Sequence, residues 1–139
     1  MTLFFDSDVI LDLLLDRSPF ADATEQLFQL VSDQSLMAVT SPVCMANIYY
    51  ILNDINKLKN AREALKAIRR YIHIIPIDED IVDRSLGLVK ADFEDSLQYF
   101  SAQKFGVDFI ITRNDHDYKS CGSNILTPKQ AIKLLRARV

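Results

Sequence analysis

The chain has 139 residues, of which 49% are hydrophobic and 25% charged, with a formal net charge of −3 at pH 7. This size and composition suit one packed domain over residues 1–139, and three glycines and four prolines give no flexible linker. No apolar run is long enough for a membrane span, and the start lacks the features of a signal peptide. Two cysteines without metal-ligand spacing indicate reduced thiols, so a cytoplasmic protein is expected.

Five short apolar runs predict strands, and most of them are separated by helical patterns. In chain order they are TLFF (2–5), LMAVT (36–40), IHIIPI (72–77), VDFIIT (107–112) and NIL (124–126). Runs such as FIIT are apolar on both faces, as expected of strands that lie between two layers of helices.

Proline and aspartate mark where the predicted helices begin. Ser18-Pro19, Ser41-Pro42 and Thr127-Pro128 put proline at the first helical position. Asp92, followed by Asp95 three residues later, is a capping-box-like pattern. The alternation of strands and helices predicts an α/β fold, a three-layer sandwich whose mainly parallel five-stranded sheet has helices on both faces.

Aspartates follow two of the predicted strands. Asp6 and Asp8 come after the first strand, and Asp115 and Asp117 follow the fourth. The carboxyl ends of parallel strands meet at one edge of the sheet, where open α/β folds bind their ligands. We therefore expect the two acidic clusters to lie at the same edge.

Ordinary structural roles compete with a functional interpretation of these acids. Asp8 and Asp92 suit helix caps, and Asp115 and Asp117 suit a turn. Asp6 is harder to explain, because an ionised carboxylate at the buried end of a strand is costly unless it is paired, hydrogen-bonded or metal-bound. Carboxylates that converge call for a cation, and ligands that are all oxygen favour Mg²⁺ or Mn²⁺ over zinc.

Four segments carry a family resemblance along essentially the whole chain. They are FFDSDVILDLLLDR, SPVCMANIYYIL, DFEDSLQYFSA and VDFIITRNDHDY. In this order they resemble the PIN domain family, the Mg²⁺- or Mn²⁺-dependent ribonuclease fold that includes VapC-type toxins and PilT N-terminus-like ribonucleases. The resemblance implies that three residues are catalytic metal ligands, namely Asp6, Asp95 and Asp117.

The same resemblance implies further residues around the metal. Asp115, Asn47 and Asp8 are additional candidates for metal contact. Ser7, Thr112 and Asn114 are expected to support the site, Ser7 through its hydroxyl group.

Two residues depart from the family pattern, Asn47 and Asp8. Asn47 stands where the family usually carries a glutamate, and no Asp or Glu lies between Leu36 and Asn53. An amide offers a neutral oxygen instead of a charged one, so the metal is expected to bind less tightly and activity to be weak, Mn²⁺-dependent or absent. Asp8, where asparagine is more usual, is the residue expected to compensate as well as to cap the helix.

Three hypotheses for function follow. The first is a metal-dependent endoribonuclease, in which a metal-held water hydrolyses RNA phosphodiester bonds. Its RNA backbone contacts are expected from Arg113, Lys57, Lys59 and Arg62, although a solvated helix face also explains the basic segment. The second is an inactive PIN domain that serves as an RNA-binding or protein-interaction module.

The third hypothesis is a phosphatase, because DSDV also resembles the opening motif of haloacid dehalogenase-type enzymes. The PIN resemblance further implies an antitoxin protein as partner, in a toxin–antitoxin pair, and self-association as a homodimer.

Overall fold

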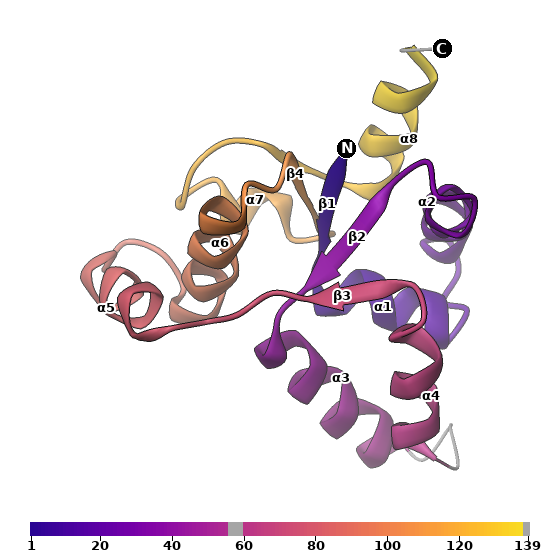
Figure 1. Cartoon of the computed structure of the whole chain (residues 1–139), viewed down its shortest axis with the longest axis horizontal. Coiled ribbons are helices and arrows are strands. Elements are labelled where there is room, and N and C mark those ends of the chain that lie inside the picture. Colours follow the sequence, from indigo (N-terminus) through magenta and orange to yellow (C-terminus); the bar gives the residue numbers. More distant parts are fainter. Residues whose placement is uncertain (56–59, 138–139) are drawn as a thin grey trace.

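A computed structural model describes residues 1–55 and 60–137 of the chain. Its strands form one five-stranded sheet in the order β3-β2-β1-β4-β5, and every pair of neighbours is parallel (Figure 1). The strands are β1 (Thr2–Phe5), β2 (Met37–Thr40), β3 (Ile72–Ile74), β4 (Phe109–Ile111) and β5 (Ile125–Leu126). All five predicted strands are confirmed, and the predicted parallel sheet is parallel throughout.

Helices connect these strands. They are α1 (Ser7–Leu14), α2 (Ala21–Ser32), α3 (Pro42–Ile55), α4 (Ala61–Ile68), α5 (Glu79–Gly87), α6 (Phe93–Phe105), α7 (Asp115–Tyr118) and α8 (Pro128–Ala137). Proline is the first residue of α3 and α8, as predicted. The same prediction for Pro19 is wrong, because α2 begins at Ala21. The Asp92 side chain caps α6 by accepting a hydrogen bond from the Asp95 N–H. Among the described residues, no helix combines the length and apolar character needed to cross a membrane.

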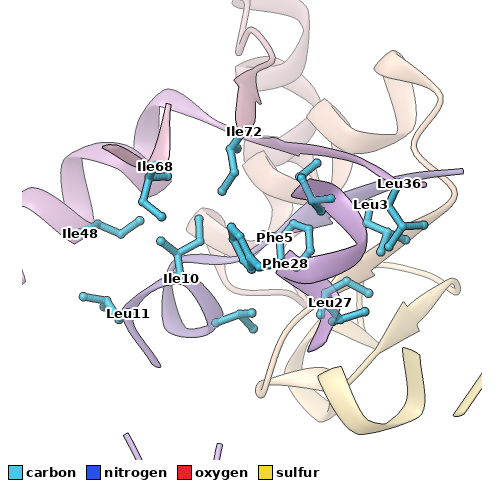
Figure 2. Close-up of a cluster of buried hydrophobic side chains, with 14 of the residues drawn as sticks. Leu3, Phe5, Ile10, Leu11, Leu27, Phe28, Leu36, Ile48, Ile68 and Ile72 are labelled. Carbon is cyan, nitrogen blue, oxygen red and sulfur yellow. The ribbon is translucent and has the colours of Figure 1, made fainter. Parts of the chain in front are cut away.

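Side chains that alternate along β1 enter two separate hydrophobic clusters. Leu3 and Phe5 belong to the larger cluster, which also holds buried residues of α1, α2, α3, α4 and α8 (Figure 2). Within it, the ring centroids of Phe5 and Phe28 are 5.1 Å apart. Phe4 points to the other face, into a smaller cluster with Ala102 of α6 and Tyr118 of α7. Helices therefore cover both faces of the sheet, which confirms the predicted three-layer architecture.

The order of the strands reverses at β1. From β1 the chain builds β2 and β3 on one side and β4 and β5 on the other. The Asp6 N–H donates to the Ile111 carbonyl at 3.0 Å, which extends the β1–β4 pairing past the end of β1. Asp6 and Thr112 therefore leave the sheet side by side, at the reversal point where open α/β sheets bind ligands.

Candidate metal centre

Asp6 is the central carboxylate of this edge, and only 8% of its surface is exposed. Its Oδ1 accepts a hydrogen bond from the Ser7 N–H at 2.9 Å and lies 3.7 Å from the Cys44 thiol. Its Oδ2 accepts a hydrogen bond from the Thr112 hydroxyl at 2.9 Å. Burial raises the pKa of Asp6, and these donors lower it in part. The surrounding protein therefore fixes the orientation of this carboxylate through both oxygens.

Thr112 connects the ends of the two central strands. Its hydroxyl donates to Asp6 and accepts from the Asn114 N–H at 3.0 Å. Ser7 and Asn114 thus contact the site through their backbone N–H groups, whereas the sequence had suggested the Ser7 hydroxyl.

Asp8 lies in the first turn of α1 and not at its cap. The helix begins at Ser7 directly after β1, so Asp6 occupies the cap position and the predicted cap role of Asp8 is wrong. Asp8 Oδ2 accepts from the Arg113 N–H at 3.2 Å, while Oδ1 is buried without a hydrogen-bond partner among the described residues. Burial, together with the negative charge of Asp6, raises the pKa of Asp8 to about 7.

Asp95 and Asp117 face the same region. Burial raises the pKa of Asp95 to about 7, and the negative charges of Asp92, Asp6 and Asp117 add to this effect. Asp95 is therefore close enough to Asp6 and to Asp117 to feel the charge of both. Tyr118 of α7 is fully buried. Its hydroxyl lies near enough to Asp6 to lower the pKa of that carboxyl. Within the described residues, however, it makes no hydrogen bond of standard geometry.

The carboxylates approach one another without closing into a cage. Within residues 1–55 and 60–137, no three His, Cys, Asp or Glu side chains are arranged so that they could hold a metal ion as they stand. Asp115 begins α7 and makes no side-chain hydrogen bond or ion pair in the described structure. The donor chemistry nevertheless fits a hard divalent ion, because the groups are carboxylates and the buried Asp8 Oδ1 has no partner. The assignment of metal ligands stays a prediction.

Asn47 contacts Glu94, an acid of the segment with Asp92 and Asp95 for which no site role was predicted. Its side-chain amide donates a hydrogen bond to Glu94 Oε1. Burial raises the pKa of Glu94, and the negative charge of Asp6 contributes, so Glu94 faces the same region as Asp6. The signal was present in the segment DFED, where an unassigned acid precedes Asp95.

A second missed residue is Asp12, which is completely buried. Its carboxylate lies 2.8 Å from Arg17 Nε and 2.7 Å from Arg113 Nε. The Arg113 guanidinium also lies 4.0 Å from the centre of the Phe20 ring. Asp12 follows Asp8 by four residues and so shares its helix face, which is the signal that the sequence offered.

The predicted RNA-contact residues have the following positions. Arg113 contacts Asp12 and Phe20 of the protein itself, and the Arg62 guanidinium lies 5.3 Å from the centre of the Tyr49 ring. Lys57 and Lys59 lie outside the described residues. Contact with RNA stays a prediction for all four.

The pKa of Asp8 predicts how the stability of the metal-free protein depends on pH. The pKa of Asp8 is about 7 in the folded protein, against an ordinary value of 3.8. The contribution of Asp8 to stability is therefore complete below pH 4 and is lost as pH rises through 7. Replacing Asp8 by Asn removes this loss. The free energy of unfolding of Asp8→Asn, relative to wild type, should therefore rise by on the order of 2 kcal/mol from pH 5 to pH 8. Urea unfolding of both proteins with chelator measures the difference, and an equal gap at both pH values would contradict it.

The chain was then compared with known proteins. Residues 2–116 match the model of the PIN domain family, so the chain belongs to this family, and the phosphatase hypothesis is not supported. Ribonuclease VapC1 of Aquifex aeolicus (strain VF5) is 28% identical over 133 residues, which cover 92% of this chain and 91% of the relative.

Two solved structures share the fold. VapBC2 from Rickettsia felis, bound to a DNA fragment from their promoter, has a TM-score of 0.72 at 12% identity, over 91% of this chain and 98% of that one. VapC20 from Mycobacterium tuberculosis, a Sarcin-Ricin loop cleaving toxin, has a TM-score of 0.68 at 16% identity, over 86% and 95%. These likenesses extend over most of each chain, so the α/β architecture is that of a PIN domain.

Proposed function

We propose that this protein is an endoribonuclease that hydrolyses RNA phosphodiester bonds with the help of Mg²⁺ or Mn²⁺. The observation that carries the proposal is the buried carboxylate of Asp6, held through both oxygens at the reversal point of the sheet. Membership of the PIN family and the similarity to a relative named as a ribonuclease support it.

In this proposal Asp6, Asp95 and Asp117 hold the ion, and Asp8, Asp115 and Asn47 lie beside it. A bound divalent ion polarises the phosphate and lowers the pKa of a water. Thr112 and the Ser7 N–H keep the Asp6 carboxylate in a single orientation. Asp8 Oδ1 has no partner in the described residues, so this oxygen can carry a proton when no ion is bound.

The experiment is cleavage of short single-stranded RNAs by the purified protein. We expect cleavage with Mn²⁺ or Mg²⁺ and none with chelator, because the ion would polarise the phosphate and activate the attacking water. Cleavage that is equally fast with chelator would overturn the proposal.

We extend the proposal to the cellular role, a toxin held by an antitoxin and assembled as a homodimer. Structural relatives include a toxin–antitoxin complex from Klebsiella pneumoniae, with a TM-score of 0.67 at 22% identity. Growth arrest on expression, relieved by a protein encoded beside the gene, tests the toxin role. Sedimentation of the purified chain tests the homodimer, and a monomer at all concentrations would contradict it.

A second candidate function is favoured by Asn47 and by the open arrangement of the carboxylates. A PIN domain without catalysis would bind RNA or a protein partner and would leave RNA intact. Calorimetry with Mn²⁺ separates the two candidates. Heat of binding that disappears in Asp6→Asn supports the nuclease, whereas RNA binding without uptake of Mn²⁺ supports the inactive module.

A further inference from the structure

We infer that Glu94 supplies the carboxylate that position 47 lacks, so that this acid enters the site from α6 and not from α3. The inference rests on the proposed function, because it concerns the same metal site. It changes the expected consequence of Asn47: the negative charge has moved across the site and has not been lost.

Two side-chain hydrogen bonds join α6 to the start of α3 and place the two residues. Ser41, Cys44 and Asn47 recur every three residues and so lie along one face of the chain that enters α3. Ser41 donates a hydrogen bond to Gln98 of α6, and Cys44 contacts Asp6. Asn47, one turn further, donates to Glu94 of α6.

Glu94 and Gln98 are four residues apart and therefore share one face of α6. That face is the one turned toward α3, because both side chains contact residues of the α3 segment. Cys44, which lies between Ser41 and Asn47 in the chain, has its thiol 3.7 Å from Asp6 Oδ1. Glu94 and Asp6 thus contact the same helix, α3, at residues that are three positions apart.

The chemistry of the pair explains why asparagine suits position 47. A glutamate there would meet Glu94 as a like charge, whereas the amide donates a hydrogen bond to it. The amide N–H engages Oε1, and a carboxylate has further lone pairs for a cation. Glu94 also lies in the first turn of α6, where the helix dipole favours an anion.

The test is calorimetric titration of Mn²⁺ into the metal-free protein and its variants. Glu94→Gln keeps an oxygen that accepts from Asn47 but removes the charge, and we expect affinity for Mn²⁺ to fall at least about tenfold. The double variant Asn47→Glu with Glu94→Gln restores a carboxylate–amide pair with its ends exchanged. We expect it to recover most of the lost affinity.

Glu79→Gln is the matched control, since Glu79 is an exposed glutamate in the first turn of α5. It should bind Mn²⁺ as wild type does. The melting temperatures of the metal-free variants should stay close to wild type, which separates loss of metal from loss of fold.

Different outcomes overturn different statements. If wild type binds Mn²⁺ and Glu94→Gln binds it equally well, Glu94 only ties α6 to α3 and the inference fails while the proposed function stands. If the double variant is no better than Glu94→Gln, the exchange of charge fails in the same way. If wild type takes up no Mn²⁺ at all, both the inference and the proposed nuclease fail.

Discussion

Asp6→Asn should reduce the rate of RNA cleavage by about a hundredfold to a thousandfold, the loss typical of removing one group that stabilises a charged transition state. The substitution keeps the size of the side chain and removes its charge. Wild-type Asp6 accepts hydrogen bonds at both oxygens, and an amide has only one oxygen. The Thr112 hydroxyl also lies 3.4 Å from Asp8 Oδ2, so it has another acceptor.

This alternative acceptor predicts that the variant folds. Since burial disfavours the ionised form of Asp6, metal-free Asp6→Asn should melt at the same temperature as wild type or higher at pH 8. Rates with Mn²⁺ and thermal melts with chelator measure the two effects. Asp83→Asn, an exposed residue of α5, is the control and should cleave as wild type does. Full activity in Asp6→Asn would remove the nuclease assignment.

Asp12→Asn should lower the free energy of unfolding by about 3 kcal/mol, because it leaves two guanidinium groups without their buried counter-charge. Asp12 is fully buried, while the Arg17 and Arg113 side chains are 37% and 32% exposed. Solvent therefore compensates each arginine in part, which keeps the loss below that of a fully buried charge. Urea unfolding of wild type and variant measures it.

Asp80→Asn is the control for this prediction. Asp80 also lies near two cations, Arg84 at 3.3 Å and Lys104 at 3.7 Å, but its side chain is 55% exposed. Exposed pairs contribute about 0 to 1 kcal/mol, so this variant should unfold nearly as wild type does. Equal losses in the two variants would show that burial of Asp12 has no special importance.

The substitution Asp12→Asn should also disturb the candidate metal centre. Asp12 holds the side chain of Arg113, whose backbone N–H donates to Asp8. Arg113 therefore links a buried ion pair to the acidic edge of the sheet, and its side chain has a structural role beside the predicted contact with RNA.

The sequence by itself determined the architecture and most of the acidic edge. Apolar runs such as FIIT required burial on both faces, and Pro42 and Pro128 marked helix starts where the structure has them. Strands of one direction bring their carboxyl ends to one edge, so Asp6 and Thr112 could be expected side by side. These features depend on local sequence patterns, which can be identified in a single sequence.

Only the tertiary structure decided how the side chains pair. The contact between Asn47 and Glu94 joins residues 47 positions apart, and the one between Arg113 and Asp12 joins residues 101 apart. No local period predicts such pairs, because they depend on how α6 lies relative to α3 and on the pairing of β4 with β1, which brings Arg113 near α1. The cap of α1 also depended on the fold. Because α1 begins at Ser7, soon after β1 ends, the capping residue is Asp6 and not Asp8.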